Sequence, residues 1–534
     1  MPALAVALLE KHGVAHQQER EPVSNPSREL VIGRRGFLRG AAAGAAVLTH
    51  PLWARAQGGV PEQATVIQVD EPTSLNPLAE FANPGLMVHA HLYEPLVDFT
   101  GPDLRVTPKL AVSWDNPKPT AWRFRLRPNV VWHDGTPFTA EDVRFTLEEG
   151  KKPTSVKARF LARVQRVEVL DPLTVQVELD EPYAPIIASW AYLYIVQRKS
   201  YEALGAAEYG RKPVGTGPYR LVSWQRQQQL VMEAFDRHWR GTHAPARIAI
   251  RGVREAGTRL AELQTGRADL VLGVPIELAD TVKADPNLSL VVLQGIRTPN
   301  FPFNNKRPPF EDRRLRQAMN YAIDREAIVQ GILQGYGEVR GGPFGKSDPW
   351  YGTEGPDYKQ DLDRARALMK EAGKDGGFSF NWLLRRDVLA KPDEVMQAIG
   401  HQLGRVGIKA NIQFVENSTW TPKNLSGDFD LSVSGYGRSV EADTIITGVR
   451  WLTENSKFYG NPQLDAAVAK ARATFDRGER IKAYRVADRI MREDACGLFS
   501  HAQSELFGVS KRFPWKPWAF GGNGALLTYY IPKT

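Results

Sequence analysis

Apolar stretches that alternate with helical segments between residues 378 and 436 constrain the fold of this chain most strongly. Residues 378–386 and 408–416 predict strands, and residues 392–407 predict a helix whose apolar positions recur at helical spacing before a closing glycine. A short helical segment near residues 422–426 precedes a third predicted strand at residues 429–436. Because strands joined through helices are most simply parallel, the pattern predicts an α/β sheet.

Polar side chains follow the predicted strands where each one ends. Arg385 and Arg386 end the first strand, and Tyr436, Arg438 and Glu441 follow the third. Ligands of open α/β sheets bind beyond the carboxyl ends of the strands, so this edge is a candidate ligand-binding site. Alternation along a strand brings one arginine of the pair inward, and a packing role for any of these side chains stays open.

Composition and charge exclude several classes of protein. The chain has 534 residues, enough for two or three domains, with the 42% hydrophobic and 24% charged content of a globular protein. The formal net charge is +9, but charges of both signs are interspersed, which does not indicate nucleic-acid binding. Cys496 is the single cysteine of the sequence, so neither an intramolecular disulfide nor a cysteine-based zinc site is possible.

The N-terminal segment has the features of an export leader. Residues 34–38 (RRGFL) resemble the twin-arginine signal, a short apolar run covers residues 40–48, and residues 54–56 form an A-x-A cleavage signal. The apolar run is too short to span a bilayer. We expect export by the Tat machinery to the periplasm and cleavage between Ala56 and Gln57; the role of residues 1–27 is not predicted.

Motifs of nucleotide and metal sites are incomplete. Residues 213–219 (PVGTGPY) lead into a predicted strand, whereas a dinucleotide fingerprint requires a helix. Residues 341–347 (GGPFGKS) lack the first glycine of a P-loop. His89 and His91 are two residues apart, do not share a helix face, and have no third histidine nearby. We therefore expect no cofactor and no metal.

Other segments predict the surrounding elements. Trp122, Phe124 and Leu126 alternate with arginines, which predicts a half-buried strand, and Thr139 predicts the N-cap of a helix. Further strands are predicted at residues 64–69, 173–179, 220–224 and 270–274. Further helices are predicted at residues 259–269, 312–333, 362–372, 462–475 and 479–494.

Short motifs along the whole chain together resemble the family 5 extracellular solute-binding proteins. This family includes the peptide-, dipeptide- and nickel-binding components of ABC importers. Each motif is weak alone, but they occur in the family's order and cover the chain after the leader. They lie at residues 74–77, 93–97, 133–137, 140–143, 213–219, 266–269, 303–305, 312–325 and 407–409.

The resemblance implies a periplasmic-binding-protein-like α/β fold, with two lobes around a hinged cleft and an extra inserted domain. Such proteins close on their ligand by hinge motion and dock onto a membrane permease. The implied division is residues 1–56 for the leader with its extension, 57–100, 205–294 and 499–534 for lobe 1, 101–204 for the inserted domain and 295–498 for lobe 2.

The resemblance also implies ligand contacts. Phe81 and Leu86 occupy a segment that supplies apolar cleft contacts in relatives, and Trp190 lies near a cleft-facing position of the inserted domain. Arg386 matches an arginine that holds a ligand carboxylate in dipeptide-binding relatives, a task suited to its planar fork. Tyr436 stands where relatives usually place a tryptophan, as an aromatic platform for the ligand.

The loop after Tyr436 departs from the family pattern. Peptide-binding relatives commonly have an aspartate there, often followed by proline, which binds the α-ammonium of the peptide. Residues 437–443 of this chain read GRSVEAD, without that pair. Glu441 or Asp443 is a possible substitute, whereas Arg438 favours a more anionic ligand.

The resemblance implies a monomeric solute receptor that delivers a peptide or another small polar solute to an ABC permease. Two alternatives stay open. One is an exported hydrolase that uses Glu441 and Asp443, although no G-x-S-x-G or H-E-x-x-H motif occurs and we predict no catalytic residue. The other is a binding protein that serves a chemoreceptor or signalling partner.

Overall fold

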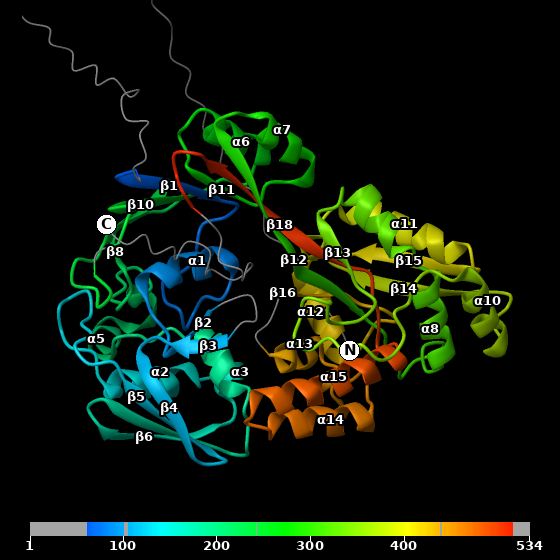
Figure 1. The fold of residues 1–534 in the computed structure, drawn as a ribbon, viewed down its shortest axis with the longest axis horizontal. Helices are drawn as coiled ribbons and strands as arrows, with labels where there is room; N and C mark the ends of the chain where they lie inside the picture. Colours follow the sequence, from blue (N-terminus) through cyan, green and yellow to red (C-terminus); the bar gives the residue numbers. More distant parts are fainter. Residues whose placement is uncertain (1–60, 101–104, 242, 438–440, 516–534) are drawn as a thin grey trace, which may run out of the picture. The chain divides into compact units, whose positions relative to one another are not determined.

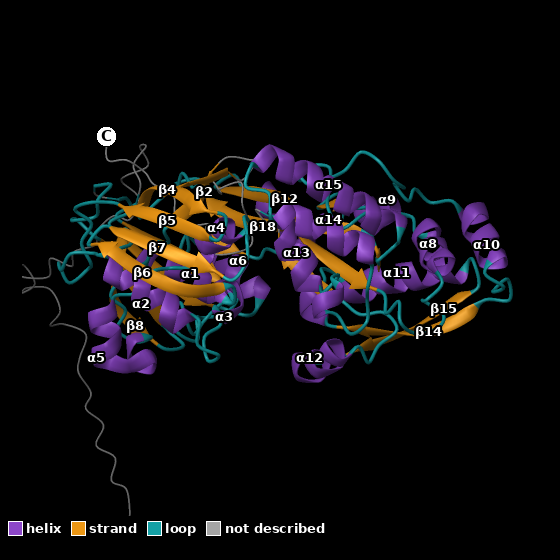
Figure 2. Ribbon diagram, turned by 90° about the horizontal axis from the view of Figure 1, so that it is seen from below, coloured by secondary structure: helices purple, strands orange, loops and turns teal. Residues whose placement is uncertain are grey.

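The computed structural model describes residues 61–100, 105–241, 243–437 and 441–515. All of them belong to one of the chain's two units, Ala56–Thr534, and the predicted leader lies outside the described residues. Strands and helices of this unit form a mixed α/β fold (Figures 1 and 2), as predicted. No helix of the described residues is both long and apolar enough to cross a membrane.

The largest sheet of the described residues has ten strands, drawn from most of the chain. Its strands are β1 (Gln63–Gln68), β8 (Tyr219–Gln225), β9 (Gln229–Ala234), β10 (Arg247–Gly252), β11 (Leu270–Leu272), β12 (Leu288–Pro302), β13 (Gly337–Val339), β16 (Ser434–Gly437), β17 (Gly497–Leu498) and β18 (His501–Ser510). The main path is β16-β12-β18-β11-β1-β10-β9-β8. β1 is parallel to β10 and β11, whereas β12 is antiparallel to both β16 and β18.

The long strands β12 and β18 run side by side, drawn in green and red in Figure 1. Their pairing shifts register between Leu293 and Arg297, where Gly295 has a φ of 61°. A left-handed residue inside a register shift is typical of a β-bulge, and glycine adopts it without strain. The predicted boundary between lobe 1 and lobe 2, after residue 294, falls at this bulge. The division into lobes stays a prediction.

A second, antiparallel sheet lies within the predicted inserted domain. Its strands are β4 (Ala111–Lys118), β5 (Ala121–Leu126), β7 (Thr174–Leu179) and β6 (Val164–Asp171), in that order, beside the pair β2 (Val97–Thr100) and β3 (Arg105–Pro108). The alternation of β5 is confirmed, because Trp122, Phe124 and Leu126 are buried. Thr139 caps α2 (Ala140–Gly150) in a capping box with Asp142.

Residues 378–436, which predict a three-stranded parallel sheet, form only part of it. β14 (Phe378–Leu384) and β15 (Ile408–Phe414) are parallel and joined through α11 (Pro392–Gly404), as predicted. The third predicted strand forms in part, as β16 at Ser434–Gly437, but its predicted parallel pairing was wrong, because β16 pairs with β12 and is antiparallel to it. Leu431, before β16, retains a parallel bridge to Trp382 of β14. The segment therefore leaves the parallel pair after Leu431 and adds to the edge of the large sheet.

The long helix predicted at residues 312–333 is broken. α8 (Arg313–Ala322) ends where Asp324 begins a new turn, and the Asp324 side chain accepts a hydrogen bond from the backbone of Ala327. An aspartate in this role starts a helix rather than continuing one. α9 (Arg325–Ala327) and a π-helical turn follow.

The other helices surround these sheets (Figure 2). They are α1 (Asn83–Leu92), α3 (Ala158–Leu161), α4 (Ile186–Ser189), α5 (Arg198–Tyr209), α6 (Ala256–Gln264), α7 (Ala279–Ala284), α10 (Leu362–Glu371), α12 (Asn417–Ser426), α13 (Ala442–Val449), α14 (Pro462–Arg472) and α15 (Arg477–Glu493). Buried apolar side chains of the described residues form three clusters, one of which joins α1 to both the large sheet and the antiparallel sheet.

Candidate functional site

Aromatic and cationic side chains from distant segments lie close together around Phe81. Phe81 is half-buried before α1, and its ring centroid lies 5.4 Å from that of Phe160 in α3. Lys157 Nζ lies 3.9 Å from the Phe81 centroid, and the guanidinium carbon of Arg159 lies 5.2 Å from it. These distances are those of cation–π contacts. The segment 157–160 thus places two positive charges beside Phe81.

The two cations differ in their surroundings. Lys157 is fully buried and its ammonium donates a hydrogen bond to the Tyr192 carbonyl at 2.9 Å. Burial lowers the pKa of Lys157 well below its ordinary value, Arg159 lowers it further, and Glu80 acts in the opposite direction. Arg159 is exposed, and an arginine stays protonated in proteins. Arg159 is therefore the positive charge that a solute can reach.

Tyr436 brings a second aromatic side chain toward Arg159 from the other end of the sequence. It lies on β16 opposite Thr298 and is half-buried. A Cβ at Gly448 would lie 2.3 Å from the Tyr436 hydroxyl oxygen, so glycine is needed for the ring to approach α13. Burial raises the pKa of Tyr436, while Arg159 and Arg450 lower it. The Tyr436 hydroxyl is therefore within electrostatic reach of both guanidinium groups.

This cluster has the composition of a site for an anionic solute. Phe81 and Tyr436 offer aromatic faces, and Arg159 and Arg450 offer planar donors that match a carboxylate. Sites of small molecules commonly combine apolar walls with a few charged groups that fix orientation. We refer to Phe81, Arg159, Tyr436 and Arg450 as the aromatic–arginine cluster.

Arg385 and Arg386 have different partners. Arg385 forms an ion pair with Asp387, and its guanidinium carbon lies 5.0 Å from the Trp420 ring centroid. Arg386 Nη1 lies 2.7 Å from the Asp393 carboxylate, and 55% of the Arg386 side chain is exposed. Arg385 is thus engaged by a carboxylate of its own turn, and Arg386 by a carboxylate in the first turn of α11. Their role in ligand binding stays a prediction.

The other predicted ligand contacts are mostly buried. Leu86 is 1% exposed in α1, and Trp190 is 0% exposed with its ring centroid 5.4 Å from that of Phe124. These positions give both side chains a packing role. Arg438 lies outside the described residues. Phe81 and Tyr436 are the predicted contacts that join the aromatic–arginine cluster.

The carboxylates after Tyr436 are neutralised by the chain's own arginines. Glu441 is 2% exposed and lies 2.8 Å from Arg480 Nη2. Burial raises the pKa of Glu441, and the Arg480 charge opposes the rise. Asp443, also buried, accepts hydrogen bonds from Arg472 Nε and from the Tyr183 hydroxyl, both at 2.6 Å. Tyr183 belongs to the predicted inserted domain, so this bond connects it with the predicted lobe 2.

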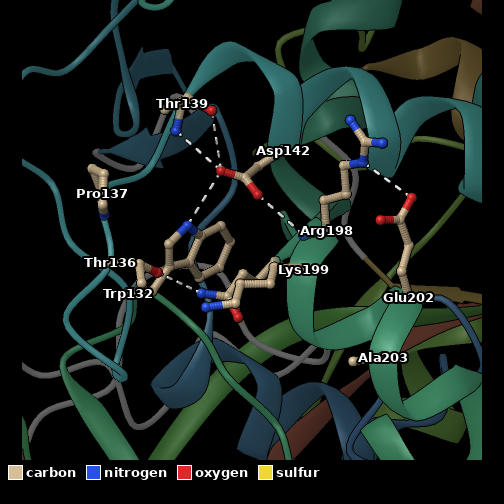
Figure 3. A pocket seen from close by; sticks show the side chains of 10 residues that line it. Trp132, Thr136, Pro137, Thr139, Asp142, Arg198, Lys199, Glu202 and Ala203 are labelled. Atoms are coloured by element: carbon tan, nitrogen blue, oxygen red, sulfur yellow. Dashed lines mark hydrogen bonds and ion pairs between the residues drawn. The ribbon is translucent and has the colours of Figure 1, made fainter.

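A surface pocket of about 590 Å³ lies at the N-termini of α2 and α5 (Figure 3). In its wall the Asp142 carboxylate accepts hydrogen bonds from the Trp132 indole at 3.3 Å and from the backbone amides of Thr139 and Arg198 at 3.1 and 3.0 Å. Burial raises the pKa of Asp142, and these bonds oppose the rise. Asp142 therefore ties two helices together.

The His89-x-His91 sequence lies inside α1. Burial lowers the pKa of His89 to about 3, and the Lys157 charge adds to this effect. His91 Nδ1 lies 2.8 Å from the Met87 carbonyl oxygen. Within the described ranges, no group of three or more His, Cys, Asp or Glu side chains is arranged to hold a metal ion.

Sequence reasoning missed the cationic part of the cluster. Lys157 and Arg159 lie in a loop and a short helix without a recognisable motif, and Arg450 follows α13 in the left-handed conformation. The signal that exists is local: Phe160 and two cations occur within four residues. Nothing in the sequence relates that segment to Tyr436.

The fold and the cluster define a protein that binds a small solute. The family model described as "Bacterial extracellular solute-binding proteins, family 5 Middle" matches residues 105–451, and the chain belongs to this family. It is 28% identical over 505 residues to the glutathione-binding protein GsiB of Pectobacterium atrosepticum, covering 90% of this chain and 95% of the relative. It is 26% identical to heme-binding protein A of Haemophilus influenzae, covering 76% and 80%.

Solved structures share the fold. HbpA2 from Haemophilus parasuis has a TM-score of 0.74 at 24% identity, covering 84% of this chain and 96% of that one. AgaA in complex with agropinic acid, from A. tumefacien R10, has a TM-score of 0.70 at 25% identity, covering 84% and 93%. The predicted family, the periplasmic-binding-protein-like fold and the role as a solute-binding protein of an ABC-type importer are confirmed.

Proposed function

We propose that this protein captures a small anionic or zwitterionic organic solute between Phe81 and Tyr436 and delivers it to an ABC-type permease. One observation carries the proposal: the exposed Arg159 guanidinium carbon lies 5.2 Å from the Phe81 ring centroid. The Arg159 charge also lowers the pKa of Tyr436. A planar guanidinium beside an aromatic ring suits a carboxylate with an apolar neighbour. Hinge closure brings such walls together around a ligand.

The relatives support a peptide-like solute that carries carboxylates. GsiB is named a glutathione-binding protein, and the AgaA structure contains agropinic acid. Glu441 and Asp443, which the resemblance offered for binding an amine, instead hold Arg480 and Arg472. Recognition in the aromatic–arginine cluster therefore works through the negative groups of the solute.

The proposed cellular route combines the leader with the family. The twin-arginine motif at residues 34–38 and the cleavage signal at residues 54–56 support Tat export and release of a monomeric receptor into the periplasm. N-terminal sequencing of the exported protein is expected to begin at Gln57. An intact leader on the exported protein would contradict this route.

A thermal-shift panel on the chain from residue 57 onward tests the proposal. The panel contains glutathione, short peptides, opine-like compounds and metal chelates. A solute at 100 times its Kd is expected to raise Tm by about 3 °C, because binding to the native state stabilises it by mass action. Carboxylate-bearing peptides or opines are expected among the stabilising compounds.

Matched variants locate the site. Arg159→Ala and Tyr436→Ala are expected to remove the Tm shift, whereas Arg166→Ala, whose side chain is 66% exposed and pairs with Glu168, is expected to retain it. If no solute stabilises the protein, or if both cluster variants bind with wild-type affinity, the proposal is wrong. Turnover of a peptide or ester in the panel would favour the hydrolase alternative.

A further inference from the structure

A set of hydrogen bonds joins the predicted inserted domain to the predicted lobe 2. The Tyr183 hydroxyl donates to Asp443 Oδ2 at 2.6 Å, and Arg472 Nε donates to the other oxygen of the same carboxylate at 2.6 Å. The backbone N–H of Ala184 donates to the Arg472 carbonyl at 2.8 Å. We refer to Tyr183, Ala184, Asp443 and Arg472 as the latch. Its donors and acceptors all belong to the chain, so it needs no atom of a solute to form.

The latch is buried and charge-assisted. Asp443 is 2% exposed, and its ion-pair partner Arg472 is also buried. Burial raises the pKa of the Tyr183 hydroxyl, and the Asp443 charge raises it further, so the hydroxyl keeps its proton and stays the donor. Beside these bonds the ring centroids of Trp122 and Phe475 lie 5.6 Å apart and join the same two parts of the chain. Bonds to a charged group are stronger than neutral ones, so the contact resists separation.

Within the predicted inserted domain, one short segment carries Arg159 and also contacts the latch. Arg159 lies in α3, and Arg163 follows four residues later. The guanidinium carbon of Arg163 lies 5.1 Å from the Tyr183 ring centroid, a cation–π distance. Arg163 Nη1 also lies 3.6 Å from the Asp180 carboxylate. The cation of the proposed solute site is therefore connected with the latch through its own domain.

Within the predicted lobe 2, α13 connects the latch with Tyr436. Asp443 lies in the first turn of α13, and the Thr447 hydroxyl one turn later donates to it at 3.2 Å. Gly448 lies in the last turn, where a Cβ would be 2.3 Å from the Tyr436 hydroxyl oxygen. One helix thus carries the latch at its start and contacts a wall of the proposed solute site near its end.

We propose that the latch holds the two walls of the solute site together and must open before a solute enters or leaves. Arg159 and Tyr436 lie on the two parts that the latch joins, so separating these parts separates the walls as well. The inference rests on the proposed function, because it concerns access to the same site. Since the chain alone forms the latch, it stabilises the closed arrangement with and without a solute. Weakening it therefore speeds entry and exit alike.

Hydrogen exchange of the chain from residue 57 onward tests the latch without a solute. The Ala184 amide reports on opening directly, because it donates across the contact. In Tyr183→Phe this amide is expected to exchange about 10-fold faster than in the wild type, the effect of losing one hydrogen bond to a charged group.

Tyr459→Phe is the matched control. The Tyr459 hydroxyl donates to the Asp494 carboxylate at 2.7 Å, and Asp494 pairs with Arg316 at 2.6 Å. These three side chains repeat the chemistry of the latch, but all of them lie in the predicted lobe 2. Tyr459→Phe is expected to change the exchange of the Ala184 amide by less than about 2-fold.

Stopped-flow binding tests the connection with the solute. The probe is glutathione, or the panel compound with the largest Tm shift if glutathione gives none. Tyr183→Phe is expected to raise the association and dissociation rate constants about 10-fold each and to leave Kd within about 3-fold, because the free and the bound protein lose the same bond. Tyr459→Phe is expected to leave both rate constants within about 2-fold of the wild type.

The inference is overturned if the Ala184 amide of Tyr183→Phe exchanges at the wild-type rate, or if Tyr459→Phe accelerates it equally. It is also overturned if exchange is faster but the association rate constant is unchanged, because the latch then does not control entry. These failures leave the proposed function standing when a panel compound binds and depends on Arg159. If no panel compound binds, the proposed function fails and solute entry through the latch fails with it, whatever hydrogen exchange shows.

Discussion

The loop after β16 and the aromatic–arginine cluster both carry charged side chains, but they use them differently. Glu441 and Asp443 are 2% exposed and each lies within 2.8 Å of an arginine nitrogen. Arg159 is exposed beside the Phe81 and Phe160 rings, and within the described residues it has no ion pair. The two buried carboxylates have their partners within the chain itself. In our proposal, a solute supplies the partner of the Arg159 guanidinium.

This difference indicates that a binding protein uses some charged side chains to stabilise its fold and others to bind its ligand. A buried ion pair is strongly destabilised when one partner is removed, because the other charge stays buried without compensation. An exposed charge without an ion-pair partner contributes little to folding, and a ligand that carries the opposite charge can become its partner. Removing charges from the two regions is therefore expected to have opposite effects on stability and on affinity.

The largest expected effect is on the loop after β16. Arg472→Met leaves the Asp443 carboxylate buried without its ion-pair partner, with hydrogen bonds from the Tyr183 and Thr447 hydroxyls alone, and is expected to lower the free energy of unfolding by about 3–5 kcal/mol. Urea denaturation measures this change. A loss below about 1 kcal/mol would mean that the Asp443–Arg472 pair does not hold the loop.

The aromatic–arginine cluster is expected to show the reverse pattern. Tyr436→Ala and Arg159→Ala are each expected to weaken solute binding about 10- to 100-fold, the loss of an aromatic contact or a charge-assisted hydrogen bond. Arg386→Ala is the control, because its guanidinium is engaged by Asp393, and a change below about 2-fold is expected. If Arg386→Ala weakens binding more than Arg159→Ala, the carboxylate of the solute binds at Arg386, after β14, and not at Arg159.

The bond between Tyr183 and Asp443 gives a smaller effect. Tyr183→Phe removes one hydrogen bond to a charged group and is expected to lower the free energy of unfolding by about 1.5 kcal/mol. The same bond links the predicted inserted domain to the predicted lobe 2, so its loss is also expected to increase proteolysis at residues 180–185. Unchanged urea denaturation would mean that the Tyr183–Asp443 hydrogen bond does not stabilise the folded state.

The smallest expected effect concerns β18, the strand that carries His501. Burial lowers the pKa of His501 to about 4, below the value near 6.5 of an unfolded chain. Below pH 6.5 the unfolded state therefore binds a proton that the native state excludes, and stability falls until the pH passes below about 4. Between pH 7.5 and 5.5 this histidine is expected to cost about 1 kcal/mol. His501→Gln is expected to remove that share of the pH dependence in urea denaturation.

Local periodicity predicted the elements that have two distinct faces. The α11 helix and the strands β14 and β15 follow from spacing alone. The α1 helix was missed because its residues from Gly85 to Leu92 are all buried, so no polar face marks the period. The break after α8 has a sequence signal in Asp324, which caps the next turn.

The site was less predictable than the fold. Tyr436 follows a predicted strand and Phe81 lies beside a motif, so both had a local signal. Arg159 had only the local signal of Phe160 and Lys157, because Phe81 lies 78 residues away in the sequence and Tyr436 lies 277 residues away. The sequence also does not reveal that Glu441 and Asp443 are paired, since Arg480 and Arg472 come from other helices.

The most direct test compares Glu441→Gln with Arg159→Gln in both stability and affinity for a carboxylate-bearing solute of the thermal-shift panel. We expect Glu441→Gln to lower the free energy of unfolding by about 3 kcal/mol, since Arg480 is left buried without its partner, and to leave Kd within about 2-fold. We expect Arg159→Gln to leave stability within about 0.5 kcal/mol and to raise Kd about 10- to 100-fold. The reverse pattern, or equal effects of both variants, would contradict the division between structural and ligand-binding charge.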